Sequence, residues 1–131
     1  MPSAVASALK GALSQVVDAG TAKRVSGSFQ LTDGTPLVMG GKTGTGDNRI
    51  EAIGAGGRIL SSKSINRTAT FVFYIGEQHF GTLTAFVPGS AAQNFTFTSA
   101  LPVQVLKGMA PLLIPYLQPG EHTLCAASNS H

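Results

Sequence analysis

Two strand-forming segments joined by a short turn constrain the fold of this chain more than any other feature. Residues 68–75 read Thr-Ala-Thr-Phe-Val-Phe-Tyr-Ile, a run of β-branched and aromatic side chains that favour extended backbone. Residues 76–79, Gly-Glu-Gln-His, have the composition of a turn, and residues 80–87 return as a second strand. The pattern predicts a β-hairpin, so the fold must contain an antiparallel sheet.

Apolar periodicity predicts a helix near each end of the chain. Residues 4–19 form the first, with Ser3 as N-cap and Gly20 as a left-handed C-cap. Its apolar stripe consists of Val5, Leu9, Leu13, Val16 and Val17. Residues 100–117 form the second, on the stripe Leu106, Met109, Leu113 and Leu117. Pro111 and Pro115 must kink or break this helix, because proline lacks an N–H and crowds the preceding turn.

The segment between the first helix and the hairpin holds one more strand. Residues 37–45 are an apolar lead-in followed by a glycine-punctuated strand, and residues 46–67, rich in Gly, Ser and Asn, read as a long loop holding at most a short strand. The order of elements predicts an α+β fold, an antiparallel sheet of three or more strands flanked by the N-terminal and C-terminal helices. Residues 1–120 form this unit, and residues 121–131 are expected to be a flexible tail.

Composition excludes several classes of protein. Charged residues make up 11% of the 131 and hydrophobic residues 43%, which is too apolar for a disordered chain. The net charge of +3 comes from scattered basic residues, so no nucleic-acid site is predicted. Gln104, Lys107 and three prolines interrupt the most apolar stretch, residues 100–117, so we expect no membrane span there. We expect no signal peptide, because residues 1–3 begin no basic and apolar leader.

The glycine-rich segment around Lys42 does not fit a nucleotide-binding loop. A phosphate-binding loop needs a glycine five residues before the glycine of its Gly-Lys-Thr, so that backbone N–H groups surround the phosphate. That position is occupied by Pro36, which has no N–H, and Gly34 lies two positions too early. The dinucleotide fingerprint fails as well, because Arg49 and Ile59 stand where its third glycine belongs.

The same segment resembles a different motif. Lys42-Thr43-Gly44-Thr45, preceded by Gly40-Gly41 and followed by Gly46-Asp47-Asn48, is similar to the Lys-Thr-Gly box of penicillin-binding proteins. Residues 15–22, Gln-Val-Val-Asp-Ala-Gly-Thr-Ala, resemble the stretch that this family places shortly upstream. A hairpin and a C-terminal helix follow in the family's order. The chain therefore resembles the C-terminal part of a transpeptidase domain, over roughly residues 4–116.

The resemblance implies a partial serine D,D-transpeptidase or β-lactamase-like domain and assigns roles to four residues. Lys42 and Thr43 would belong to the hydrogen-bond network around the nucleophile. Gly44 would let ligand and backbone approach closely. The Thr45 hydroxyl would bind the terminal carboxylate of the substrate, and its N–H would form half of an oxyanion hole. The resemblance implies neither a metal nor a cofactor.

Two boxes that the family requires are missing from their places. Ser7-Ala8-Leu9-Lys10 matches the nucleophile box Ser-x-x-Lys, but it lies too close to Lys42 and on the helix matched to another family element. Ser64-Ile65-Asn66 matches the Ser-x-Asn box but follows the Lys-Thr-Gly strand instead of preceding it. We interpret both as accidental. Acyl transfer needs an activated nucleophile, so we expect no turnover by this chain alone.

Other polar residues are weaker candidates. His122 and Cys125 fall in the predicted tail, and the single cysteine excludes a disulfide within the chain. His79 is expected in solvent at the hairpin turn. Asp47 and Glu51 are near enough in sequence to suggest a carboxylate pair, but a solvated loop face is the expected environment. Asp47 and Arg49 are well placed to shape the mouth of a cleft beside the Lys-Thr-Gly strand.

The sequence therefore favours the C-terminal piece of a peptidoglycan D,D-transpeptidase whose parent binds cell-wall stem peptide or β-lactam outside the cytoplasmic membrane. Its partners would be the rest of the transpeptidase domain and, through exposed apolar surface, further copies of itself. The alternative is a non-catalytic module that binds protein or cell-wall peptide. A nucleotide-binding protein is disfavoured by the failed loop spacing.

Overall fold

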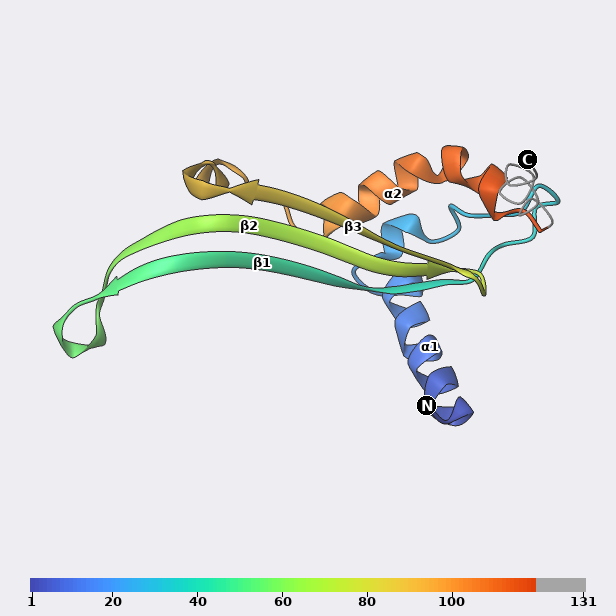
Figure 1. Ribbon diagram of the computed structural model, residues 1–131, viewed down its shortest axis with the longest axis horizontal. Coiled ribbons are helices and arrows are strands. Elements are labelled where there is room, and N and C mark those ends of the chain that lie inside the picture. Colours follow the sequence, from blue (N-terminus) through green and yellow to red (C-terminus); the bar gives the residue numbers. More distant parts are fainter. Residues whose placement is uncertain (120–131) are drawn as a thin grey trace, which may run out of the picture.

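The protein is an α+β structure in which a three-stranded antiparallel sheet of order β1-β2-β3 carries two helices (Figure 1). The computed structural model describes residues 1–119 of the chain. Helix α1 spans Ser3–Asp18 and helix α2 spans Ala100–Leu113. The strands are β1 (Met39–Ile53), β2 (Ile59–Ile75) and β3 (His79–Pro88). The order helix, strand, hairpin, helix is as predicted, and the expected tail lies outside the described residues.

The predicted hairpin is present, with β2 and β3 paired in one continuous register. Phe71 pairs with Leu83 and Phe73 with Gly81, and Gly76 adopts a left-handed φ of 64° in the turn. A Cβ at Gly81 would stand 2.5 Å from the Phe73 ring, so only glycine lets that ring lie across β3.

The core lies on one face of the sheet. Side chains alternate along a strand, so Phe71 and Ile75 of β2 share this face with Met39 of β1. Helix α2 covers it with Val103, Leu106 and Ala110, which belong to the core, and Pro102 of the same helix is buried as well. Leu106 was predicted on the core stripe of this helix, whereas Met109 is only half-buried. The other face, which carries Lys42, Val72 and Phe80, is referred to below as the open face.

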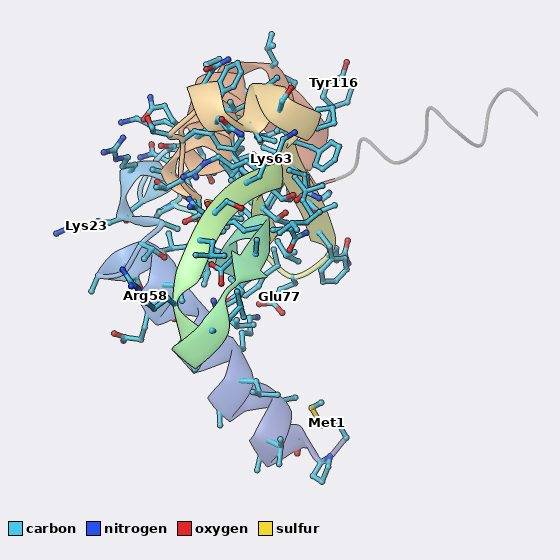
Figure 2. The ribbon with its side chains drawn as sticks, turned by 90° about the vertical axis from the view of Figure 1, so that its left-hand side faces the viewer. Met1, Lys23, Arg58, Lys63, Glu77 and Tyr116 are labelled. Carbon is cyan, nitrogen blue, oxygen red and sulfur yellow. The ribbon has the colours of Figure 1, made fainter. Side chains whose placement is uncertain are left out.

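Helix α1 crosses beside β1 rather than lying flat on the sheet. Val17 at its C-terminal end is buried in the core, whereas Val5 and Leu9 of the predicted stripe are exposed. Figure 2 shows the helix projecting away from the rest of the molecule toward Met1. Its middle turns reach the open face, where the Tyr74 hydroxyl donates to the Lys10 carbonyl at 3.1 Å. Only the C-terminal half of the stripe therefore contributes to the core.

Residues 46–67 do not form the predicted loop. β1 continues to Ile53 and β2 begins at Ile59, so the two strands extend past β3 as a two-stranded ribbon closed by a 3₁₀ turn over Ala55–Gly57 (Figure 1). Gly56 and Gly57 take left-handed φ values of 80° and 76° at the tip. Glycine and serine, which disfavour strands, are accommodated because the neighbouring strand supplies the backbone hydrogen bonds.

Both predicted caps of the first helix are wrong. Ser3 is the first helical residue, Pro2 is the N-cap, and no side chain caps this end. Gly20 does not adopt the left-handed conformation, since its φ is not positive. Glycine is required at position 20 because there is no room for a side chain: a Cβ there would stand 2.9 Å from the Val16 Cα.

The second helix is shorter than the predicted 100–117, and of the two prolines expected to kink or break it, only Pro115 lies at a break. α2 stops at Leu113 and Ile114–Leu117 continue as a 3₁₀ turn containing Pro115, while Pro111 stays inside α2. By length and hydropathy, Ala100–Leu117 is the one segment among residues 1–119 that would suffice to cross a membrane. In the structure this segment supplies the buried residues over the sheet.

Candidate functional site

The four residues of the Lys-Thr-Gly segment lie in the first half of β1, an edge strand of the sheet. Alternation places Lys42 and Gly44 on the open face, and Thr43 and Thr45 on the face that α2 covers. The structure therefore does not bring the four side chains onto one face. What they share is the outer edge of β1, the edge that faces away from β2.

The backbone at this edge is directed outward at the two threonines. The Gly76 N–H donates to the Val38 carbonyl at 2.8 Å, which extends the β1–β2 register by one pair. Residues that bond to the neighbouring strand alternate with residues that do not. Up to Asn48, where the β1–β2 register is continuous, even-numbered residues of β1 therefore bond to β2, and Thr43 and Thr45 direct their N–H and C=O groups to the outer edge.

The Lys42 side chain turns back along this edge. Its Nζ donates to the Thr43 carbonyl at 2.6 Å, so the ammonium group lies beside the outward-directed backbone although Lys42 itself is exposed. A positive charge and a row of backbone groups are thus presented together. Such an edge can accept an extended peptide by strand addition, with the charge placed to attract a carboxylate.

Thr43 joins the strand to the end of the first helix. Its side chain is 8% exposed, and the Thr21 and Thr43 hydroxyls lie 2.7 Å apart in a hydrogen bond. Ala22 next to Thr21 is fully buried. The segment 15–22, which resembles the stretch upstream of the Lys-Thr-Gly box in penicillin-binding proteins, is therefore in direct contact with Lys42–Thr45 through Thr21 and Thr43.

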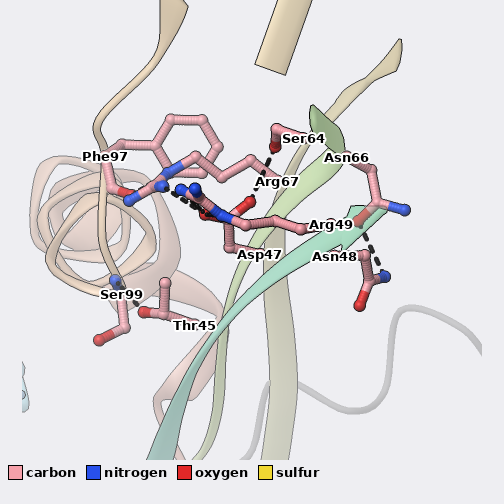
Figure 3. A network of polar contacts seen from close by, with 9 residues as sticks. All are labelled: Thr45, Asp47, Asn48, Arg49, Ser64, Asn66, Arg67, Phe97 and Ser99. Carbon is pink, nitrogen blue, oxygen red and sulfur yellow. Dashed lines mark hydrogen bonds and ion pairs between the residues drawn. The ribbon is translucent and has the colours of Figure 1, made fainter. Parts of the chain in front are cut away.

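Thr45 is held by the start of the second helix. The backbone N–H of Ser99, the N-cap residue of α2, donates to Thr45 Oγ1 at 3.0 Å (Figure 3). An oxygen that accepts this bond keeps its own hydrogen for a further acceptor. The Thr45 hydroxyl is therefore arranged as a donor in a fixed position.

Packing requires glycine at position 41 but not at position 44. A Cβ at Gly41 would stand 2.4 Å from the Val72 carbonyl oxygen and 2.7 Å from the Phe71 ring, so the packing of β1 on β2 requires glycine there. A Cβ at Gly44 would meet nothing within 4 Å. The fold places no such demand on Gly44.

A polar network centred on Asp47 lies next to this segment (Figure 3). The carboxylate accepts two hydrogen bonds from Arg49, at 2.7 and 2.9 Å, and one from the Ser64 hydroxyl at 2.8 Å, and Arg67 Nη1 lies 3.8 Å away. These interactions, with the Arg49 hydrogen bonds first, hold the pKa of Asp47 below its ordinary value.

Arg67 links this network to the segment before α2. Its Nε donates to the Phe97 carbonyl at 2.7 Å, and its guanidinium lies over the Phe97 ring at 5.5 Å from the centroid. Arg67 was not singled out from the sequence, because residues 46–67 were predicted to be a loop. In the β1–β2 register Arg67 lies directly opposite Asp47. An acidic and a basic residue at paired positions of two strands is the sequence signal that would have identified Arg67.

The remaining candidates are distributed over the molecule. Asp47 does not pair with Glu51, since its partners are the two arginines and Ser64. Ser64 and Asn66 bond to Asp47 and Asn48 respectively, within the ribbon. Lys10 of the Ser7–Lys10 match forms an ion pair with Glu77. His79 is half-buried at the start of β3, so its expected solvent environment was wrong.

No group of three or more His, Cys, Asp or Glu side chains that could hold a metal comes together within residues 1–119. His122 and Cys125 lie outside the described residues. Comparisons of the chain with protein families, with curated proteins and with solved structures gave no match. The class that fold and site define is thus an α+β protein with a lysine-bearing, outward-directed edge strand.

Proposed function

We propose that this chain is the C-terminal lobe of a serine D,D-transpeptidase domain and supplies the strand that binds the peptide substrate. The observation that carries the proposal is the placement of Lys42-Thr43-Gly44-Thr45 on an edge strand with the backbone of both threonines directed outward. A substrate backbone added at this edge would find donors, acceptors and a positive charge in one row.

The chemistry of each residue supports this role. The outward N–H of Thr45 suits an oxyanion formed when a peptide carbonyl becomes tetrahedral, and its hydroxyl suits the terminal carboxylate. Lys42 Nζ beside the Thr43 carbonyl supplies the countercharge. Gly44 has open space around its Cβ position, which leaves room for a ligand backbone. Thr43 is buried against Thr21, so in this lobe it acts by holding the strand.

The nucleophile would come from the rest of the parent domain. Within residues 1–119, neither serine motif forms a hydrogen bond or ion pair with Lys42–Thr45: Lys10 pairs with Glu77, and Ser64 bonds to Asp47. The lobe therefore binds and orients, and the proposal assigns it no turnover alone. The parent would act on peptidoglycan stem peptides in the periplasm or on the envelope side of the membrane.

The proposal is tested by titrating the chain with a peptide ending in D-Ala-D-Ala. We expect weak binding that falls roughly tenfold in Lys42→Ala, the size of one charge-assisted hydrogen bond. The matched control is Lys63→Ala, another exposed lysine on β2, which should bind like the unchanged protein. Equal binding by Lys42→Ala and the unchanged protein would overturn the proposal.

A second candidate function is a non-catalytic module that uses the same edge to bind protein or cell-wall peptide. It is favoured by the absence of a nucleophile beside Lys42 within the described residues. A labelled β-lactam tests whether the chain carries a nucleophile of its own. A stable acyl adduct on the chain alone would contradict its role as a lobe without a nucleophile, and Ser7 would then be the first residue to test as the nucleophile. Binding of D-Ala-D-Ala without dependence on Lys42 favours the module.

A further inference from the structure

The outer edge of β1 is uncovered along its second half. Helix α1 and the residues after it pack beside the start of the strand, as far as the Thr21–Thr43 contact, whereas no described element lies beside the part that runs out toward the ribbon tip (Figure 1). From Gly44 to Ile53 every residue is exposed except Asp47, which is half-buried. An edge of this length with no proline and unpaired backbone groups is a template for another strand.

The charges on this half-strand alternate in sign. Asp47, Arg49 and Glu51 are odd-numbered residues of β1. The β1–β2 register shifts between Asn48 and Arg49, where Ile65 of β2 is left without a partner, so the extra residue is on β2 and β1 keeps its alternation. The three side chains therefore share one face, and their backbone groups are directed to the outer edge, as at Thr45. Within residues 1–119 Arg49 contacts Asp47, and Glu51 has no ion pair. Glu51 is therefore a negative charge at the edge without a countercharge.

An antiparallel pairing of β1 with a second β1 satisfies these groups in one register. A register is defined by the sum of the numbers of two residues that lie opposite each other. In the register with a sum of 100, Arg49 faces Glu51 of the second copy, and by symmetry the contact occurs twice. Both are outward-directed residues, so they form a hydrogen-bonded pair. Ile50 then meets its own copy on the two-fold axis. Ile50 is 63% exposed and is an aliphatic side chain that the isolated chain leaves in solvent.

Neighbouring registers are less favourable. A sum of 98 places Arg49 against Arg49 and Asp47 against Glu51, which are like-charge pairs that destabilise a sheet. A sum of 102 places Glu51 against itself. A sum of 96 sets Asp47 against Arg49 but leaves Glu51 unpaired and brings Asn48, not Ile50, to the axis.

We propose that β1 is a dimerisation strand, which pairs edge to edge with β1 of a second copy through Arg49 and Glu51 around Ile50. The result is a six-stranded sheet with two-fold symmetry, since each copy contributes three strands. The interface lies beyond Lys42–Thr45 and does not depend on the function proposed for that segment.

Cross-linking tests the register directly. In a Cys125→Ser background, Ile50→Cys places two thiols in a non-hydrogen-bonded antiparallel pair, whose Cα atoms lie about 4.5 Å apart, within disulfide reach. We expect rapid formation of a covalent dimer. Ala52→Cys lies on the same face but four residues out of register with its own copy, so it should stay monomeric on the same timescale. Cross-linking through Asn48→Cys in preference to Ile50→Cys would overturn the proposal.

Charge exchange tests the interface without cross-links. Sedimentation of the unchanged chain should show masses rising toward twice 13.4 kDa with concentration. Glu51→Lys and Arg49→Glu should each be monomeric, because each creates two like-charge pairs. Mixing these two variants should restore a heterodimer, because every pair is then opposite in sign. A folding defect cannot produce that rescue.

Two outcomes would overturn the inference. One is a monomeric mass for the unchanged chain at all concentrations. The other is association that survives Glu51→Lys but is lost in Phe80→Ser, since Phe80 is 81% exposed on the open face and its loss would show that this face, not the edge, holds the copies together.

Discussion

The hydroxyls of Thr21 and Thr43 lie 2.7 Å apart and join the residues after the first helix to the edge strand of the sheet. Around this bond, Ala22 is fully buried and Gly20 is in close backbone contact with Val16. The segment 16–22 therefore holds β1 in place at Thr43, the residue next to Lys42. Its side chains are explained by packing and hydrogen bonding alone.

The Thr21–Thr43 bond should contribute to stability mainly through Thr43. Thr43→Val buries a methyl group in place of a hydroxyl and leaves Thr21 to bond with water, so we expect a loss of about 1 kcal/mol in the free energy of unfolding. Chemical denaturation of both single variants and the Thr21→Val/Thr43→Val double variant gives the coupling energy. Effects of the two single changes that simply add would show that the hydroxyls do not interact in solution.

The two central glycines of β1 should separate stability from binding. Gly41→Ala forces a Cβ against the Val72 carbonyl and the Phe71 ring, so we expect destabilisation of about 1–3 kcal/mol. Gly44→Ala meets open space, so its melting temperature should stay close to that of the unchanged protein, while binding of a D-Ala-D-Ala peptide weakens. Equal destabilisation by both changes would show that Gly44 is also held by packing.

The Asp47 network should make stability depend on pH in the acid range. The pKa of Asp47 is lowered in the folded chain, chiefly by its hydrogen bonds from Arg49 and then Ser64. A lowered pKa means that the contribution is fully present above the unfolded value, near 3.8, and is lost as pH falls through the folded value. The melting temperatures of the unchanged protein and Asp47→Asn should therefore differ at neutral pH and converge below pH 3.8. A constant difference across that range would contradict the assignment.

Local sequence pattern was sufficient for the elements whose own residues favour their conformation. The β2–β3 hairpin, the apolar helices and the break at Pro115 follow from side-chain type and proline geometry. The β1–β2 ribbon was missed because its strands are built from Gly, Ser, Asn and charged residues, and their extended form depends on pairing across a distance in sequence. The C-cap was missed because Gly20 is required by close packing against Val16 and does not take a left-handed φ.

The candidate site was predictable as a segment but not as a geometry. The apolar residues before Lys42 predicted a strand, and the motif Lys42–Thr45 was placed on it. Side-chain alternation puts Lys42 and Thr43 on opposite faces of the sheet, which the motif alone does not show. Arg67 and Ser64 became visible only once the register placed them beside Asp47. Residues that act through a partner strand are hidden whenever that strand is mistaken for a loop.

Arg67 should position the Thr45 hydroxyl through the segment before α2. It holds the Phe97 carbonyl at 2.7 Å, two residues before the Ser99 N–H that bonds Thr45. Arg67→Met keeps the aliphatic stem but removes the donor, so we expect the Ser99 amide to exchange with solvent roughly tenfold faster, as one lost hydrogen bond allows. Arg49→Met is the matched control, because Arg49 bonds only Asp47 among the described residues. If the Ser99 amide exchanges at the same rate in both variants, then the Phe97 contact does not hold this segment, and Thr45 is fixed by α2 alone.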